Sequence, residues 1–156
     1  MYPKLDLPDG LIEFATEFSR FKTPKERTQG WTEQPDERRG LGDVLDTIGT
    51  LMVWRYLVEA GVPATYLLTA GEGDVADIQV RTTALGLLNV NVKTSRWQPS
   101  HDNPCSGGHL AIKKVETVKG LADIYVQVFV HLEDPWEQPP HVHICGCVGQ
   151  DKVARL

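Results

Sequence analysis

The residues of this chain best suited to chemistry are Asp77, Asn91 and Lys93, in two segments of alternating polar and apolar residues. Asn91 and Lys93 are two residues apart in "NVNVKTSRW", so an extended strand projects both side chains from one face. Asp77 lies among apolar residues in "VADIQV", where an unpaired carboxylate is costly to bury. If the two segments pair, a carboxylate, an amide and an amino group come together.

These groups match the needs of phosphodiester hydrolysis, which uses a hard divalent ion, oxygen ligands and a cation near the attacking water. Asp77 can supply a carboxylate ligand, and the Asn91 side chain a neutral oxygen. The Val92 carbonyl points sideways from its strand and is a candidate third ligand. Lys93 would orient or deprotonate the water, or stabilise the charge that builds on the phosphorus.

Both charged residues also have a structural interpretation. An aspartate in a strand is often a hydrogen-bond acceptor for the backbone, and a strand lysine often protects a sheet edge from pairing with another chain. These two interpretations stand beside the catalytic one.

In these residues the chain resembles the PD-(D/E)XK nuclease superfamily, whose members share the restriction-endonuclease-like fold. The resemblance rests on Ala76-Asp77, on Asn91-Val92-Lys93 and on the Thr94-Ser95 that follows, and loosely it covers Gly42 to the C-terminus. The later pattern "LAIKK…ADIYVQVFV" is similar to strands of phage and bacterial members. The resemblance implies an α/β fold, with a mixed sheet flanked by helices.

The resemblance also implies an activity: an endodeoxyribonuclease that uses Mg²⁺, with Mn²⁺ as a possible substitute. Asp77, Asn91 and Val92 would be its metal ligands, and Lys93 would act on the water. DNA would be the partner. Cleavage of both strands of a duplex by one small site usually requires two copies, so a homodimer or higher homo-oligomer is expected.

The sequence departs from the family pattern at three positions. Position 76 is alanine where proline is frequent, and position 91 is asparagine where the family has an acidic residue. The glutamate that many relatives carry on the first helix is replaced by Thr50. Asp46, one turn earlier on the same face, is the candidate replacement ligand. Asn91 leaves three interpretations open: a natural variant of an active enzyme, an inactivated form, or a protein that binds nucleic acid without cutting it.

The elements that must position these residues follow from periodicity. Apolar spacing predicts a helix over 11–21, and a polar, glycine- and proline-containing segment predicts a loop over 23–42. A second helix is expected from Asp43, its N-cap, to Gly61. Alternation and β-branched residues predict strands in 64–70, 75–83, 87–95, 109–115, 122–132 and 141–148. We therefore expect one α/β nuclease-like domain over 1–156, with an N-terminal helix and loop (1–42) and an α/β core (43–156).

Composition is that of an ordinary globular chain of 156 residues, 41% hydrophobic and 24% charged. No apolar run reaches the ~18 residues of a membrane span, and the N-terminus does not resemble a secretory signal. A cytoplasmic location without membrane association is therefore expected. The net charge of −5 disfavours nucleic-acid binding at long range, although bound metal or a local basic patch can reverse the sign.

The histidine and cysteine residues of "HVHICGC" suggest a second possible site. The three cysteines are an odd number, which favours free thiols. Zinc is the alternative, with an adjacent pair from this strand and residues of the loop 96–109 as ligands. The strand residues concerned are His141, His143, Cys145 and Cys147. The preferred expectation is that the cysteines pack as small apolar residues and that the histidines face the surface or another subunit.

Overall fold

Six strands form one mixed sheet in the computed structural model, which describes residues 2–21, 36–67, 76–97, 122–132 and 139–153. The strand order is β1-β6-β5-β4-β3-β2. Neighbours are antiparallel except β4 and β5, which are parallel. The strands are β1 (Lys4–Asp6), β2 (Ala64–Tyr66), β3 (Ile78–Thr82), β4 (Gly86–Arg96), β5 (Ile124–His131) and β6 (His141–Gly149). The described helices are α1 (Leu11–Phe21), α3 (Asp36–Glu59) and the short α5 (Gln150–Val153).

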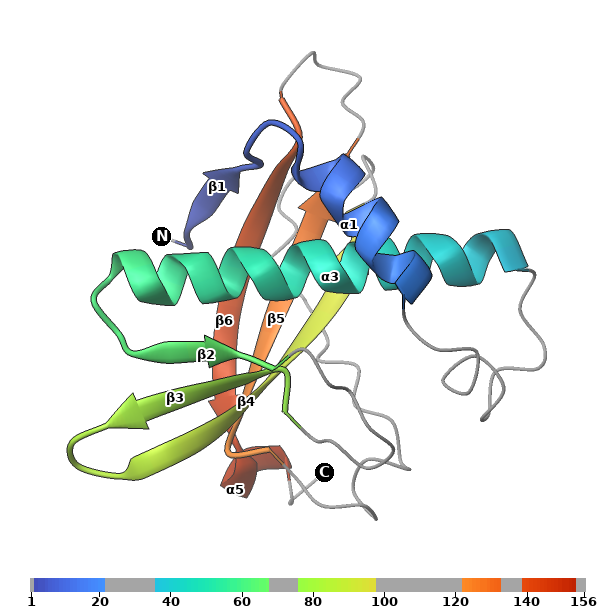
Figure 1. The fold of residues 1–156 in the computed structure, drawn as a ribbon. Helices are drawn as coiled ribbons and strands as arrows, with labels where there is room; N and C mark the ends of the chain where they lie inside the picture. The colour runs from blue at the N-terminus through green and yellow to red at the C-terminus, as the bar shows by residue number, and fades with distance from the viewer. Residues whose placement is uncertain (1, 22–35, 68–75, 98–121, 133–138, 154–156) are drawn as a thin grey trace.

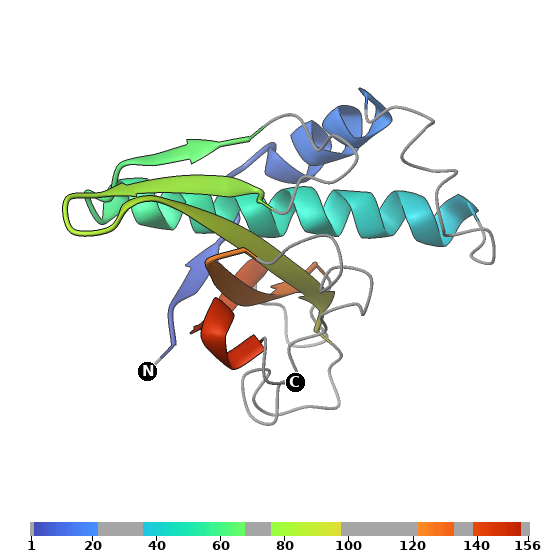
Figure 2. The same cartoon turned by 90° about the horizontal axis from the view of Figure 1, so that it is seen from below.

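The long helix α3 crosses one face of the sheet, and α1 packs against α3 (Figure 1). Seen along the sheet, the strands curl around α3 (Figure 2). The core lies between them, where Ile48 and Met52 of α3 meet Val90, Val92 and Val128 of the sheet. Burial of each such side chain stabilises the fold by about 1.5–3 kcal/mol. The even-numbered residues of β4 therefore face the helix.

Helix α3 approaches β4 closely at Gly49. A Cβ atom placed there would clash with the Thr94 side chain of β4. Gly49 costs helix stability relative to alanine, and the space it leaves is occupied by the residue that follows Lys93. Helix and site strand are thus fitted to one another at this point.

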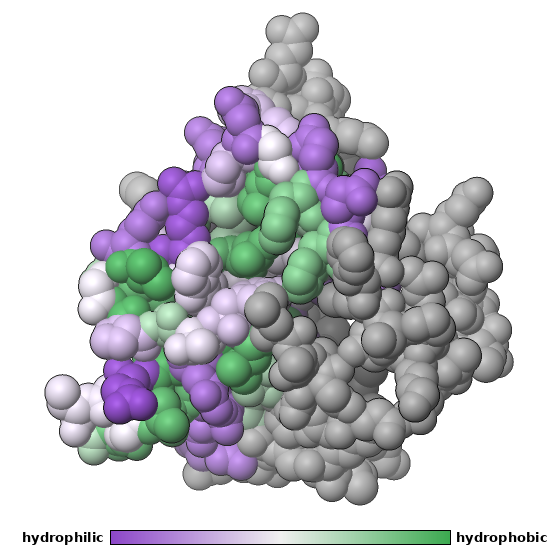
Figure 3. Space-filling model, in the orientation of Figure 1, coloured by the Kyte–Doolittle hydropathy of each residue, from purple (hydrophilic) through white to green (hydrophobic). Residues whose placement is uncertain are grey.

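Apolar residues on the visible face of the molecule are interspersed with hydrophilic ones (Figure 3). Among the described residues, the most exposed large apolar side chain is Leu85, in the turn between β3 and β4, and Leu87 lies beside it. Tyr56 and Val58 near the end of α3 are also exposed. Singly exposed apolar side chains of this kind are normal on a globular surface.

The mixed α/β class and the helix over 11–21 are confirmed. The second helix is longer than expected: it starts at Asp36, so the loop prediction is wrong for 36–42. Asp43 is not an N-cap, because it lies inside the helix, where its carbonyl accepts a hydrogen bond from the Thr47 hydroxyl. Good helix formers at positions 37, 38, 39 and 41 outweigh the two glycines of this segment.

Strands β2, β3 and β5 fall inside predicted segments, and β4 and β6 overlap theirs and extend one residue beyond them. In contrast, β1 and α5 were not predicted, because three and four residues carry no measurable period. Asp77 directly precedes β3 instead of lying within it. The predicted strand over 109–115 lies outside the described residues. The candidate zinc ligands of the loop 96–109, which are His101, Cys105 and His109, lie outside them too. No helix in the described ranges is both long and apolar enough to cross a membrane.

Candidate functional site

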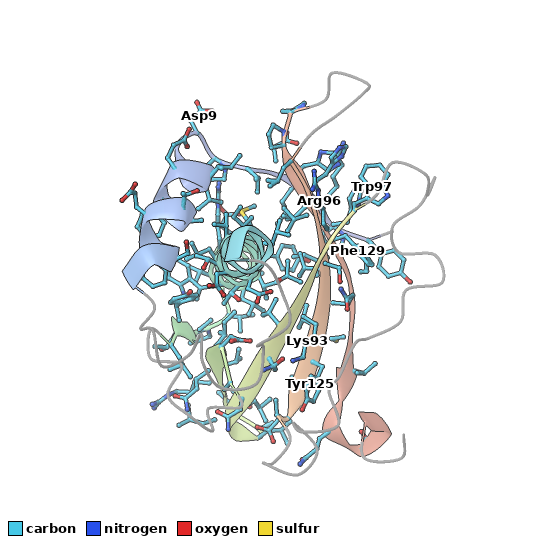
Figure 4. All side chains as sticks on the ribbon, turned by 90° about the vertical axis from the view of Figure 1, so that its right-hand side faces the viewer. Asp9, Lys93, Arg96, Trp97, Tyr125 and Phe129 are labelled. Carbon is cyan, nitrogen blue, oxygen red and sulfur yellow. The ribbon has the colours of Figure 1, made fainter. Side chains whose placement is uncertain are left out.

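The candidate site is on the face of β4 that points away from α3. Val90 and Val92 are buried toward the helix, so Asn91 and Lys93 project from the opposite face, as the alternation predicted. Both are partly buried. Their neighbours in the parallel ladder are Tyr125 for Asn91 and Gln127 for Lys93. Figure 4 shows Lys93 and Tyr125 close together where β4 and β5 run side by side.

Asp77 reaches this strand through a direct hydrogen bond. The backbone N–H of Val92 donates to Oδ2 of Asp77 at 2.7 Å, and the Asp77 N–H donates to the Val90 carbonyl at 2.9 Å. The Val92 nitrogen belongs to the peptide that joins Asn91 to Val92. The carboxylate is therefore held beside the segment in which the sequence placed its partners.

The Val92 carbonyl points to the same side of β4 as Asp77. In a strand, the N–H and C=O of one residue point the same way, and the Val92 N–H points to Asp77. Asn89, an odd-numbered residue, instead directs its carbonyl to Asp123 at the start of β5. Pairing between β3 and β4 ends at Val90. The strand thus presents Val92 to the side where β3 has separated from it.

Tyr66 of β2 is a site residue that sequence reasoning missed. Burial raises the pKa of its hydroxyl, and the nearby negative charge of Asp77 raises it further. The Asp77 carbonyl also accepts the N–H of Leu67 at 2.9 Å. Tyr66 therefore stays protonated beside the carboxylate. The pairing of β2 with β3 brings them together, and no spacing in the sequence could have indicated it.

Asp46, the candidate ligand from the helix, is exposed on α3. It lies one turn before Gly49, where α3 meets Thr94 of β4. Its participation in the site stays a prediction. Thr50, at the position of the family glutamate, is buried.

Asp123 offers a structural counterpart to Asp77. Its Oδ2 accepts the Asn89 N–H at 2.7 Å, so two carboxylates bind the backbone of β4 three residues apart and on opposite sides. This is the backbone-acceptor role that was the structural interpretation of Asp77. The corresponding interpretation of Lys93 as an edge residue stays a prediction, because β4 lies between β3 and β5 but its pairing with β3 ends at Val90.

At the other end of this face, Trp97 packs against three histidine rings. The Trp97 ring lies 4.5 Å from His131, 6.1 Å from His141 and 5.9 Å from His143, between ring centroids. His131 and His141 pair across β5 and β6 and are buried. The expectation that His141 faces the surface is therefore wrong. Trp97 therefore packs against the rings of the neighbouring strands.

His143 is the partly exposed member of this cluster. Burial lowers its pKa below the usual 6.5, and the charges of His141, Lys4 and His131 lower it further. In the described part of the chain, no three His, Cys, Asp or Glu residues are grouped so as to hold a metal ion. That finding gives no support to zinc at His141, His143, Cys145 and Cys147, although the loop ligands lie outside the described residues.

The cysteines of β6 differ from the expectation of apolar packing with free thiols. Cys145 is disulfide-bonded, whereas Cys147 is a free and exposed thiol. Cys145 has no partner residue in the β5 register, because β6 carries an extra residue opposite the step between Gln127 and Val128. The bulge shifts the alternation, so the four residues at two-residue spacing do not share one face as a regular strand would require.

No family model, no curated protein and no solved structure matches this chain. The chemistry of the site is therefore argued from its own residues.

Proposed function

We propose that this chain is a metal-dependent endodeoxyribonuclease with a restriction-endonuclease-like fold, in which Asn91 replaces the second acidic ligand. The observation that carries the proposal is the hydrogen bond from Val92 to Asp77, 2.7 Å long. It joins two residues that are fifteen positions apart in sequence and whose convergence the nuclease interpretation required. A long helix followed by β2, β3 and β4, with β5 parallel to β4, is compatible with that fold.

The donor atoms suit a hard divalent cation. Asp77 supplies a carboxylate, Oδ1 of Asn91 is buried, and the Val92 carbonyl points to the Asp77 side of the strand. Mg²⁺ and Mn²⁺ prefer such oxygen ligands. Only Asp77 among these three carries a negative charge, so the site fits the ion in ligand type and binds it weakly. A bound ion would supply charge neutralisation at the phosphate and a more acidic water.

The protein residues would each have a separate role in the reaction. Asp77 and Asn91 would orient the ion and, through it, the scissile phosphate. Lys93, on the same face as Asn91, would contact the attacking water and offset the negative charge that grows on the phosphoryl oxygens. Tyr66, protonated beside Asp77, would help to fix the carboxylate in place.

Plasmid and branched DNA cleavage with Mg²⁺ or Mn²⁺ tests this proposal. The chain as given is compared with Asn91→Asp, Asn91→Glu and Lys93→Ala. An acidic residue at position 91 should create or increase cutting, and Lys93→Ala should abolish it. If none of the versions cuts any substrate, the nuclease proposal is wrong.

Asn91 itself favours a second function, a nucleic-acid-binding protein that retains the fold and lacks the chemistry. The chain has a net charge of −5, which repels phosphate at long range. Such binding would therefore have to come from a local patch of basic residues. Electrophoretic mobility shifts at several salt concentrations distinguish the two functions. A non-catalytic binder keeps its affinity after Lys93→Ala and gains no cutting from Asn91→Asp.

A further inference from the structure

Gln127 of β5 carries a buried acceptor atom that the fold does not use. Its side chain is 8% exposed. The Nε2 atom donates to the Val128 carbonyl at 3.2 Å and to Ser95 Oγ at 3.3 Å. A carbonyl can only accept, so the amide nitrogen must face Val128 and the position of Oε1 is fixed. Oε1 accepts no hydrogen bond from the residues that the structure describes.

A buried acceptor of this kind lowers the stability of the fold unless a donor hydrogen-bonds to it. A buried amide oxygen without a donor destabilises the fold, and native proteins satisfy nearly all such groups with protein, water or ligand. An apolar side chain of similar size would avoid the cost. The amide at position 127 therefore indicates a donor that arrives from water or substrate.

The location of Gln127 points to the identity of that donor. Gln127 and Lys93 are direct partners in the parallel ladder of β4 and β5. Direct partners on paired strands project from the same face of the sheet. The Gln127 side chain thus starts beside that of Lys93, the residue that the proposed function assigns to the attacking water.

We propose that Gln127 is a positioning residue of this site, whose Oε1 accepts a hydrogen bond from the attacking water while Lys93 contacts the same molecule. The inference rests on the proposed nuclease function. Gln127 Oε1 accepts a hydrogen bond from one O–H of the water. This contact orients the water so that a lone pair of its oxygen points toward the phosphorus. As the new P–O bond forms, the P–O bond to the leaving nucleotide breaks. The other water proton passes to solvent, and the leaving oxygen takes a proton from solvent.

Single-turnover cleavage by Gln127→Leu and Gln127→Glu tests this role, both in the chain as given and in an Asn91→Asp background. Gln127→Leu removes the acceptor at similar volume. It should slow cleavage about tenfold, the value of one ordinary hydrogen bond, with unchanged substrate KM. Gln127→Glu keeps an acceptor and should recover much of the rate. Its added carboxylate beside Lys93 should also move the pH–rate profile to higher pH, a change that a structural role would not produce.

Gln79→Leu is the matched control. Gln79 is a partly buried glutamine on β3 whose Nε2 donates to Asn89 Oδ1 at 3.2 Å. Its replacement should leave rate, KM and pH profile unchanged. Thermal unfolding of each variant identifies any that fail to fold, and Gln127→Glu, which preserves shape, then decides the test.

The outcomes separate the two proposals. If Lys93→Ala is inactive while both Gln127 variants match their parent in rate and pH profile, Gln127 is structural and the nuclease proposal stands. A higher KM with unchanged kcat assigns Gln127 to substrate binding and overturns the positioning role. If no version cuts, including Asn91→Asp, both proposals fail.

Discussion

The two ends of the β4–β5 face share the same alternation of side chains but carry different groups, polar side chains at one end and aromatic rings at the other. At one end Asn91 and Lys93 lie beside Tyr125 and Gln127, and Gln127 Oε1 accepts no hydrogen bond from the described residues. At the other end Trp97 meets three histidine rings, and His141 Nδ1 lies 2.8 Å from the Pro139 carbonyl. Figure 4 shows Trp97 on the side of the sheet away from the helices. A shared face is therefore no indication of shared function.

The difference teaches that the two ends of one sheet face can be held by different interactions, ring packing at one and polar contacts at the other. Rings in edge-to-face contact stabilise one another by about 0.5–1.5 kcal/mol per pair. A buried acceptor with no donor destabilises its own surroundings. Substitutions at the two ends should accordingly affect different properties of the protein.

The largest expected effect is on cleavage at the polar end. In the Asn91→Asp background, Asp77→Ala and Lys93→Ala should each reduce the cleavage rate by about 10²–10⁴-fold, the range for a positioned acid–base group. Asp123→Ala is the control, because Asp123 makes the same 2.7 Å bond to the backbone of β4. Equal losses for Asp77→Ala and Asp123→Ala would mean that both carboxylates only hold the strand.

Stability should respond most at the aromatic end. Trp97→Ala removes contacts with three rings. Because Trp97 is partly exposed, it should lower the free energy of unfolding by about 2 kcal/mol, below the 3–5 typical of fully buried Trp or Phe. Lys93→Ala should change it by less than about 1 kcal/mol. Urea unfolding measures both values. If Lys93→Ala lowered the free energy of unfolding more than Trp97→Ala, the division of this face into a polar end and an aromatic end would be wrong.

Metal affinity gives the next smaller effect. Asn91→Asp adds a second negative ligand of the same shape. Mn²⁺ should therefore bind at least about tenfold more tightly than to the chain as given, a difference of ~1.4 kcal/mol in binding free energy. Isothermal titration calorimetry measures this without any cleavage assay. Asn89→Asp is the control, since Asn89 lies on the same strand and receives a hydrogen bond from Gln79. Tighter binding in both variants would indicate general electrostatics.

The smallest effect is a pH dependence at the aromatic end. The pKa of His143 is lowered in the folded protein, so the unfolded chain binds its proton more readily. Stability contributed by the neutral ring is therefore present above pH 6.5 and declines as the pH falls from there toward the folded pKa. His143→Gln should flatten the change in melting temperature between pH 7.5 and 5.5. An unchanged slope would exclude this histidine as its source.

Sequence patterns predicted what depends on neighbours along the chain. The face shared by Asn91 and Lys93 follows from a two-residue period, and the bounds of α1 follow from a helical one. Partners across strands did not follow. Tyr66 beside Asp77, Gln127 beside Lys93 and His131 beside His141 all depend on strand order and register. The bulge in β6 also displaced the histidine and cysteine alternation, which no local period could reveal.

The contact of Gly49 with Thr94 has a consequence for the dynamics of the protein. Because helix α3 touches β4 at the residue next to Lys93, the helix and the site strand should open together as one cooperative unit. A cation bound at Asp77 would then slow amide hydrogen exchange near Gly49, on the opposite face of the sheet. The middle of α3 would report on occupancy of a site that it does not contact.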